Sequence, residues 1–383
     1  MCLLTIHQGV IFKMEKVRLL DRPEDYERLG LNPNVVEEWE HGRRRKPTEV
    51  PAMENWYFDS IMDDGTKVVV VFMTKTGDKR TIPKDSPNLR IQSTSPDGKH
   101  FDDAFYLDPK ECETRVGECY VKYGEHSFIG DLTDVDIYVN PENGIGANLH
   151  VHSLTKPFRP GTGYIAFGDD ESKEYTWLTF PRNDVTGTIN YDGSEKEVHG
   201  TAYHDHQFHS SDSMSIIHHW FWGRASLGDY TVAMFDIVAN EKYGFQQIPI
   251  FCVMDKSGEV IFDGTQHGQS HIKDLYWSDP AKKYFPKTTE FDYERDGKKV
   301  TFTVTWSEEL EVRTPETIFG QLNPAMAEKL DKMGLDPSYI RYKADAKLTI
   351  DDGNQPTNAT GDMIYEYAYF GKTDRRAHIE LEK

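Results

Sequence analysis

The sequence predicts an all-β protein whose antiparallel strands form barrels or sandwiches. From Trp56 onward, short runs rich in Val, Ile, Thr, Tyr, Phe and Trp recur along the chain. Pairs of turn-forming residues separate these runs, namely Asp64-Gly65, Asp97-Gly98, Asn143-Gly144, Asp192-Gly193, Ser257-Gly258, Asp296-Gly297 and Asp352-Gly353. Strands bounded by such turns are typical of antiparallel hairpins, and a succession of hairpins indicates a barrel or a sandwich.

Several of these runs also alternate between two faces, which supports the strand assignment. We predict strands over Val68–Met73, Thr186–Tyr191, Thr301–Trp306 and Met363–Tyr369. In the last of these, Tyr365, Tyr367 and Tyr369 fall on one face. A period of two predicts one packed face and one solvated face. A helix is expected over Ala325–Met333, because Pro324 stands near its start and Gly334 just past its end.

The chain has 383 residues, which exceeds a typical domain of about 100–200 residues. We predict an N-terminal arm over residues 1–50, an N-terminal domain over 51–212 and a C-terminal domain over 213–383. Residues 1–14 are apolar but lack the basic region of a secretory signal, and the sequence leaves open whether Met1 or Met14 is the native start. The basic run Arg43-Arg44-Arg45-Lys46 is interpreted as part of a solvated arm.

Composition excludes several kinds of partner. The net charge is −20, so the chain repels nucleic-acid phosphates and anionic membrane surfaces. No apolar stretch approaches the roughly 18 residues of a membrane span. We therefore expect a cytoplasmic protein without a nucleic-acid partner, and the sequence does not decide whether it forms a homo-oligomer. The four cysteines are too few for a disulfide scaffold and are expected to be buried thiols.

One region is denser in chemistry-bearing residues than the rest, because six of the fifteen histidines fall between residues 199 and 219. Histidine moves protons near neutral pH and is the commonest metal ligand. One interpretation is that His204 and His206 share a strand face and chelate a metal ion with a third ligand. A second is that Asp205 and Asp236 flank an imidazole at an aromatic pocket and act in acid/base catalysis. A third is that the histidines only satisfy backbone groups at strand ends.

The same region resembles a known family. The residues that carry the resemblance are Thr186–Ile189, Val198–Gln207, Trp220–Arg224 and the earlier Glu54–Phe58. Together they are similar to the carotenoid 1,2-hydratase (hydroxyneurosporene synthase) and AttH-like superfamily, which includes kievitone hydratase-like proteins and lipocalin-like Diels–Alderases. The resemblance implies two lipocalin-like β domains and a pocket for a hydrophobic ligand near their junction. It also implies that His206 is the motif histidine and Asp236 the aspartate of a later strand. Phe208 and Met234 stand where carotenoid hydratases have Trp and Tyr, which puts a carotenoid substrate in doubt.

These observations lead to a functional hypothesis. We expect a lyase or isomerase, independent of cofactor and metal, that hydrates, isomerises or cyclises a hydrophobic unsaturated small molecule such as an isoprenoid or polyphenol. Asp236 is the expected general acid, His206 orients water or substrate, and Asp205 and His204 are further catalytic candidates. The expected substrate-binding residues are Trp56, Tyr203, Phe208, Trp220, Trp222, Arg224 and Met234, of which Tyr203 and Trp222 are expected to line one cavity with His206 and Asp236.

Three alternatives stay open at the level of sequence. The protein could be a non-catalytic carrier of a hydrophobic ligand, or a metal-dependent enzyme that uses His204 and His206. Asp236 could also be a structural ion-pair partner of Arg224 rather than an acid, because a buried, unpaired carboxylate is costly. Other common enzyme classes find no support, since neither a GxxxxGK[ST] phosphate loop nor a GxSxG turn occurs.

Overall fold

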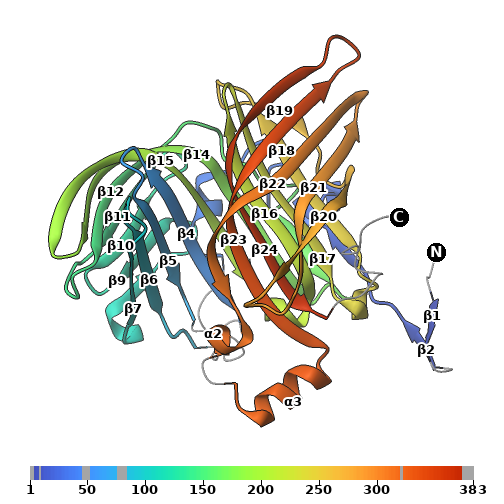
Figure 1. Ribbon diagram of the computed structural model, residues 1–383, viewed down its shortest axis with the longest axis horizontal. Coiled ribbons are helices and arrows are strands. Elements are labelled where there is room, and N and C mark those ends of the chain that lie inside the picture. The colour runs from blue at the N-terminus through green and yellow to red at the C-terminus, as the bar shows by residue number, and fades with distance from the viewer. Residues whose placement is uncertain (1–3, 8–9, 45–51, 76–83, 320–321, 373–383) are drawn as a thin grey trace. The chain divides into compact units, whose positions relative to one another are not determined.

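The computed structural model describes residues 4–7, 10–44, 52–75, 84–319 and 322–372. These residues form two compact units (Figure 1). The N-terminal unit comprises the described residues within 19–166 and 171–212, and the C-terminal unit comprises those within 1–18, 167–170 and 213–383. Both are built almost entirely of antiparallel strands, which confirms the predicted all-β fold class.

The N-terminal unit is organised around one long sheet. Its strand order is β7-β6-β5-β4-β15-β14-β12-β11-β10-β9-β8, and β13 pairs off this path with β14 and β3. The strands are β3 Val17–Leu19, β4 Met53–Met62, β5 Lys67–Met73, β6 Asn88–Thr94, β7 His100–Tyr106, β8 Cys112–Thr114, β9 Cys119–Tyr123, β10 His126–Gly130, β11 Asp134–Val139, β12 Gly146–Ser153, β13 Tyr164–Phe167, β14 Lys173–Tyr191 and β15 Ser194–His209. The short helical elements of this unit are α1 Pro23–Leu29, η1 Glu38–His41 and η3 Pro109–Glu111.

The C-terminal unit contains a nine-stranded sheet in the order β19-β18-β17-β16-β24-β23-β22-β21-β20. Its strands are β16 Ile217–Leu227, β17 Tyr230–Ala239, β18 Gln247–Met254, β19 Val260–Asp263, β20 Gly268–Ser278, β21 Lys283–Arg295, β22 Lys298–Arg313, β23 Leu335–Asp351 and β24 Thr357–Gly371. Strands β18 and β20, which stand near opposite ends of this order, also contact each other, so the sheet curls around its own core. The unit also contains η4 Ser213–Ser215, η5 Glu241–Tyr243, α2 Pro315–Phe319 and α3 Pro324–Lys332, and the terminal hairpin of β1 Leu4–His7 and β2 Val10–Lys13.

Turn chemistry explains two of the longest hairpins. Asp192 and Gly193 connect β14 to β15, and both have positive φ, at 56° and 73°. Asp296 and Gly297 connect β21 to β22 in the same way, at 52° and 78°. Two consecutive residues with positive φ are the mark of a type I′ turn, whose twist matches that of the flanking strands. The Asp-Gly pairs in the sequence therefore predicted both turns.

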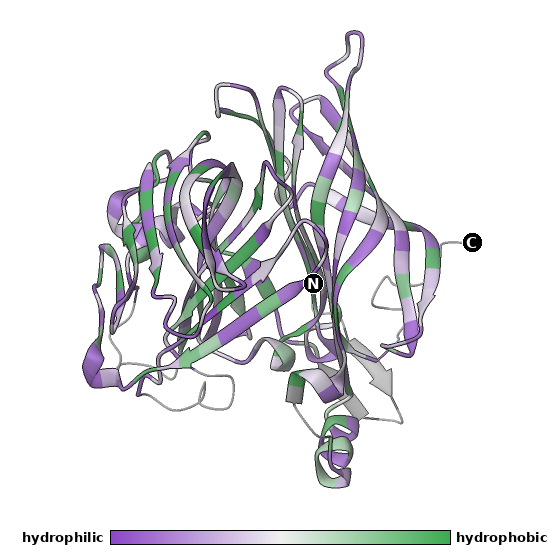
Figure 2. Ribbon diagram, turned by 60° about the vertical axis from the view of Figure 1, so that its left-hand side comes forward, coloured by the Kyte–Doolittle hydropathy of each residue, from purple (hydrophilic) through white to green (hydrophobic). Residues whose placement is uncertain are grey.

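Each unit buries its own hydrophobic core. Along most strands apolar and polar residues alternate, as the colours of Figure 2 show. The expected helix is present as α3, where the Asn323 side chain accepts a hydrogen bond from the N–H of Met326. One expectation was wrong: from Met363 to Gly371, β24 is buried on both faces rather than solvated on one. On the second face Phe370 contacts Trp220 edge-on, with ring centroids 5.1 Å apart.

Candidate active site

Asp236 lies in the interior of the C-terminal unit, on strand β17. Met234 and Val238 share its face of the strand, and all three side chains are fully buried. The strand register places Asp236 opposite Phe221 of β16 on one side and Pro249 of β18 on the other. A carboxyl group thus interrupts a face that is otherwise apolar, which is the arrangement that shifts a carboxyl pKa most strongly.

The Asp236 carboxyl group is held by one strong hydrogen bond. Gln247 Nε2 donates to Asp236 Oδ2 at 2.7 Å and also to Ser270 Oγ at 3.1 Å. No hydrogen bond of normal geometry from the described residues reaches Asp236 Oδ1. Burial raises the pKa of Asp236 to about 6, although the Gln247 and Ser270 side chains lower it. At mildly acidic pH the buried group therefore retains a proton that it can donate.

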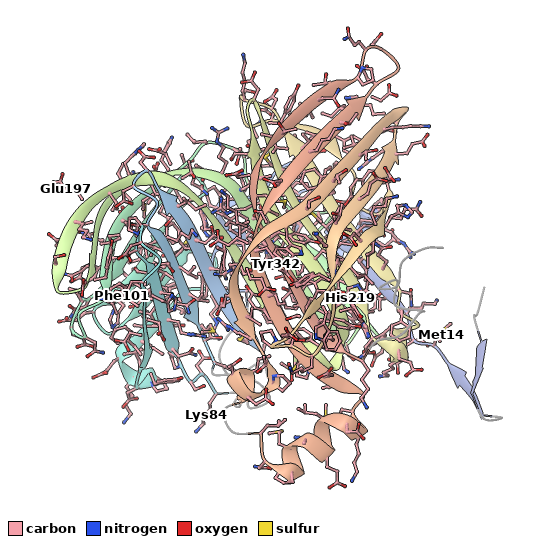
Figure 3. The ribbon with its side chains drawn as sticks, in the orientation of Figure 1. Met14, Lys84, Phe101, Glu197, His219 and Tyr342 are labelled. Carbon is pink, nitrogen blue, oxygen red and sulfur yellow. The ribbon has the colours of Figure 1, made fainter. Side chains whose placement is uncertain are left out.

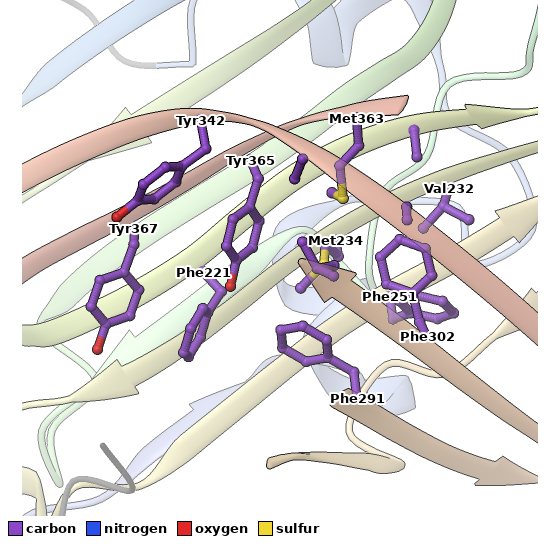
Figure 4. Close-up of a cluster of buried hydrophobic side chains, with 14 of the residues drawn as sticks. Phe221, Val232, Met234, Phe251, Phe291, Phe302, Tyr342, Met363, Tyr365 and Tyr367 are labelled. Atoms are coloured by element: carbon purple, nitrogen blue, oxygen red, sulfur yellow. The ribbon is translucent and has the colours of Figure 1, made fainter. Parts of the chain in front are cut away.

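Three tyrosine side chains share this interior with Asp236, namely Tyr293, Tyr365 and Tyr367. All three are buried, and within the described residues none of their hydroxyl groups makes a hydrogen bond of normal geometry. Figure 4 shows Tyr365 and Tyr367 beside Phe221, whose ring centroid lies 6.1 Å and 4.6 Å from theirs. Burial is the main cause of the raised pKa of each phenol, and the Asp236 carboxyl group raises all three further.

His219 also belongs to this interior. It lies two residues before Phe221 on β16, and its ring centroid is 5.6 Å from that of Phe221 and 5.5 Å from that of Tyr367. Its Nδ1 atom is 2.9 Å from Nδ1 of His218 (His219 is labelled in Figure 3). From the sequence, contacts with backbone groups at strand ends were one of three interpretations of the histidines, His219 among them. The even spacing of 219 and 221 was the available signal that its side chain points inward.

The strand register separates Asp236 from several side chains that were expected near it. Trp222 pairs with Phe235, and Arg224 pairs with Ala233. Because neighbouring residues of a strand point to opposite faces, these positions face away from Asp236. Trp220 lies on the same outer face, with its ring 5.9 Å from that of Phe235. The structure therefore brings Met234 but not Trp220, Trp222 or Arg224 to the Asp236 side of the sheet, and it does not support the pairing of Asp236 with Arg224.

In the N-terminal unit, His206 lies within a buried network of charged groups. Its ring stacks on Trp56 with centroids 4.8 Å apart, and Nδ1 lies 3.2 Å from the backbone oxygen of Glu40. Nε2 lies 3.5 Å from Glu54 Oε1. Burial lowers the pKa of His206, an effect that Glu54 opposes. The indole of Trp56 donates a hydrogen bond to the backbone oxygen of His41 at 3.1 Å.

The network continues through the segment that was expected to be a solvated arm. Arg43 is buried and forms ion pairs with Glu54 at 3.0 Å and Asp85 at 2.7 Å. Arg159 donates to both carboxylate oxygens of the fully buried Glu40. The prediction for the basic run was thus wrong at Arg43, because acidic partners distant in sequence compensate its charge; residues 45 and 46 lie outside the described residues.

His204 is held by aromatic contacts rather than by acidic groups. Its ring stacks on Phe180 at 4.0 Å and on His41 at 5.3 Å. Burial, reinforced by His41, lowers the pKa of His204 well below its usual value, so the ring is neutral. Phe208 lies on the same strand face and is fully buried. Within the described ranges, no group of three or more His, Cys, Asp or Glu side chains could hold a metal ion.

Asp205 and Tyr203 point to the opposite face of β15. The Tyr203 hydroxyl donates to Asp205 Oδ2 at 2.7 Å, and the Trp177 indole donates to the same oxygen at 3.1 Å. Gln207 Nε2 donates to both oxygens of Asp205 at 3.1 Å. The pairing of β15 with β4 is regular from Gly200 to His209, so Tyr203 and His206 face opposite sides of the sheet. Asp205 is therefore a well-satisfied acceptor in a buried polar network.

The fold and these two interiors define a protein of two lipocalin-like antiparallel β units. A model of the Diels-Alderase-like family matches residues 35–302, and the chain belongs to this family. The match confirms the resemblance that the sequence motifs indicated.

Solved structures share the fold. A protein assigned as AttH from Nitrosomonas europaea has a TM-score of 0.58 and 16% identity, over 87% of this chain and 98% of that one. CghA with bound Sch210972 has a TM-score of 0.59 and 14% identity, over 86% and 90%. Kievitone hydratase from Nectria haematococca has a TM-score of 0.54 and 11% identity, over 94% and 98%.

One curated relative also matches. The quinolone epoxide rearrangement protein asqO of Emericella nidulans is 23% identical over 104 residues. The match spans 27% of this chain and about a quarter (28%) of the relative's own length. Separately, no helix in the described part of the chain has the length and apolar character needed to cross a membrane.

Proposed function

We propose that this protein is an enzyme that uses acid/base catalysis, without a cofactor, on a hydrophobic unsaturated small molecule. The observation that carries the proposal is the fully buried Asp236, whose pKa burial raises to about 6 inside an aromatic core. A carboxyl group of this kind is a proton donor near neutral pH. Hydration, double-bond isomerisation and cyclisation each begin with, or are accelerated by, such a donor.

The surroundings of Asp236 suit a cationic or polarised intermediate. The faces of Phe221, Tyr365 and Tyr367 meet in the same interior, and an aromatic face attracts a cation by about 0.5–2 kcal/mol. His219 is an imidazole within reach of this aromatic group and is a candidate for the role first given to His206. The contacts of His206, His204 and Asp205 favour structural roles, but we retain all three as catalytic candidates to be tested in the same assay.

The names of related proteins support this class of chemistry. One structural relative is called a hydratase, the matching family is named for Diels-Alderases, and the curated relative is called an epoxide rearrangement protein.

The test is the variant Asp236→Asn, assayed on a panel of isoprenoids and polyphenols by liquid chromatography coupled to mass spectrometry, which separates isomers as well as hydrated products. We expect the variant to fold normally and turnover to fall by roughly 10²–10⁴, the usual contribution of a positioned proton donor. Asp292→Asn is the matched control, because Asp292 lies on the nearby strand β21 with its side chain 41% exposed. Full activity in a folded Asp236→Asn variant would exclude the acid role.

A non-catalytic carrier of a hydrophobic ligand is the second candidate, favoured by the buried hydroxyl groups that the described residues leave without partners. In that case the wild-type protein binds panel members and converts none of them. The third candidate, a metal-dependent enzyme using His204 and His206, is tested by metal analysis of the purified protein.

A further inference from the structure

The C-terminal interior contains a cluster of buried polar atoms without hydrogen-bond partners among the described residues. They are Asp236 Oδ1, Tyr293 Oη, Tyr365 Oη, Tyr367 Oη and Thr289 Oγ1. The Thr289 hydroxyl lies near Tyr365 without forming a hydrogen bond of normal geometry. A buried polar group that lacks a partner costs about 1–3 kcal/mol, so such groups are rare in folded proteins.

Several other tyrosines of the same unit are satisfied, so unsatisfied hydroxyl groups are not a general property of this core. The Tyr276 hydroxyl donates to Glu309 and meets the hydroxyl of Tyr342, at 2.7 Å in both cases. The Tyr339 hydroxyl donates to Glu366. Asp236 affects the pKa values of Tyr293, Tyr365 and Tyr367. The Tyr243 hydroxyl of this unit also lacks a hydrogen bond among the described residues, but its pKa shift has other causes. Three of the four such phenols of this unit are therefore grouped around the proposed acid.

The strand register explains why these groups converge. Asp236 pairs with Phe221, and Phe221 pairs with Tyr367, so three neighbouring strands present these side chains to one interior. Gly223, two residues on, faces the same interior, and a Cβ atom there would lie 2.4 Å from Met363 Cε. Glycine at this position therefore lets the Met363 and Tyr365 side chains approach β16 closely.

We infer that this interior binds a largely apolar molecule that carries a hydrogen-bond-accepting oxygen, such as an unsaturated ketone, and that Tyr293, Tyr365 and Tyr367 donate to that oxygen. Phenol O–H groups and a protonated carboxyl group are donors. An acceptor oxygen satisfies them, whereas a pure hydrocarbon leaves them unpaired. The inference names the substrate class of the proposed active site and to that extent rests on the proposed function.

The test compares two probes that differ only in a carbonyl group. Chalcone is an unsaturated ketone, and 1,3-diphenylpropene is the same framework with a methylene group in its place. Dissociation constants are measured by calorimetry for the wild-type protein and for Tyr365→Phe, Tyr367→Phe and Tyr293→Phe. Tyr123→Phe is the matched control, because Tyr123 is a buried tyrosine of the N-terminal unit whose hydroxyl likewise lacks a hydrogen bond within the described residues.

We expect at least one of the three phenylalanine variants to lower the preference for chalcone over 1,3-diphenylpropene by about three- to tenfold, the effect of one lost hydrogen bond. The control should leave the preference unchanged. The melting temperature of the three variants should stay the same or rise by a few degrees, because an unsatisfied buried hydroxyl has been removed.

An unchanged preference in all three variants would overturn the inference, and so would the absence of binding by either probe. A fall in melting temperature in all three would show that the chain itself satisfies the hydroxyls, and would also overturn it. The outcome is separable from the proposed function. If the preference depends on the tyrosines but no panel member is converted, the binding inference stands and the enzymatic proposal fails. If Asp236→Asn abolishes turnover while the preference for chalcone is unchanged in the three tyrosine variants, the enzymatic proposal stands and the binding inference fails.

Discussion

Buried carboxyl groups of the N-terminal and C-terminal units differ in their partners, as Glu54 and Glu40 on one side and Asp236 on the other show. Glu54 and Glu40 contact Arg43 and Arg159 at 3.0 Å and 2.6 Å. Asp236 has no ion pair among the described residues, and its main partner is the neutral amide of Gln247. A buried carboxylate that is paired with a cation is neutralised within the chain, whereas Asp236 keeps one oxygen that no hydrogen bond from the described residues reaches. The comparison favours a structural role for Glu54 and Glu40 and agrees with the acid role proposed for Asp236.

Among the tests of this comparison, the largest change in the free energy of unfolding is expected at Arg43. The substitution Arg43→Met leaves Glu54 and Asp85 without their cation. An uncompensated buried charge costs about 3–5 kcal/mol, so we expect the free energy of unfolding to fall by that order. Urea denaturation followed by tryptophan fluorescence measures the change. Arg115→Met is the control, because its partners Glu113 and Glu118 are solvent-exposed, and it should leave the midpoint unchanged. Equal stability of the Arg43 variant would show that the network is not structural.

Acid should weaken the N-terminal unit through its buried histidines. Burial lowers the pKa of His41 from 6.5 to about 3, with help from His206 and Arg44 and against the opposing effect of Asp131. A histidine whose folded-state pKa is depressed contributes stability above pH 6.5 that is lost as the pH falls toward 3. A pKa difference of this size corresponds to about 3–5 kcal/mol. We expect the free energy of unfolding of this unit to decrease over that range, and His41→Asn to reduce the slope. A slope unchanged by the substitution would contradict this assignment.

Asp236 should give the C-terminal unit the opposite dependence. Its pKa rises from 3.8 in the unfolded chain to about 6 in the fold. The stabilising effect of the retained proton is therefore complete below about pH 4 and is lost as the pH rises through about 6. This difference between the folded and unfolded pKa corresponds to about 3 kcal/mol in the free energy of unfolding. We expect Asp236→Asn to stabilise the protein relative to wild type more at pH 8 than at pH 4, measured by thermal denaturation at both pH values.

The same titration should limit activity, since only the protonated carboxyl group can donate. We expect kcat/KM to fall tenfold per pH unit above about pH 6. Gln247→Leu removes the hydrogen bond that lowers the pKa of Asp236. This substitution should therefore move the fall in kcat/KM to higher pH. If kcat/KM of the Gln247 variant falls at the same pH as that of the wild type, this would argue against Asp236 as the titrating acid.

The smallest effect is expected at His204. Its neutral ring packs between Phe180 and His41, and no hydrogen bond from the described residues reaches Nδ1. Phenylalanine has a similar shape and no polar atom, so His204→Phe should change the free energy of unfolding by less than about 1.5 kcal/mol at neutral pH. Turnover should also be retained. A folded variant without activity would restore the catalytic or metal-binding interpretation of His204.

The fold was predictable because its signals are local. The Asp-Gly turns at 192 and 296 need only the conformational freedom of neighbouring residues, and the alternation in Thr301–Trp306 needs only the geometry of one strand. The burial of Arg43 was not predictable, since its partners Glu54 and Asp85 come from other segments of the chain. The alternation that places Tyr365 and Tyr367 on one face was visible in the sequence. The sequence did not show that Asp236 faces these two tyrosines.

The sequence by itself determined the all-β class, the positions of the hairpin turns, the family, and an aspartate set among apolar neighbours at 236. Those features depend on residues close together in the chain, where sterics and strand periodicity suffice. Only the tertiary structure decided which buried groups are satisfied. Pairing across β16, β17 and β24 brought Phe221, Asp236 and Tyr367 together, whereas folding of the N-terminal unit gave Glu54 the cation that Asp236 lacks. Hydrogen bonds and ion pairs act over a few ångströms between residues far apart in sequence, so only their placement in space distinguishes a structural carboxylate from a proton donor.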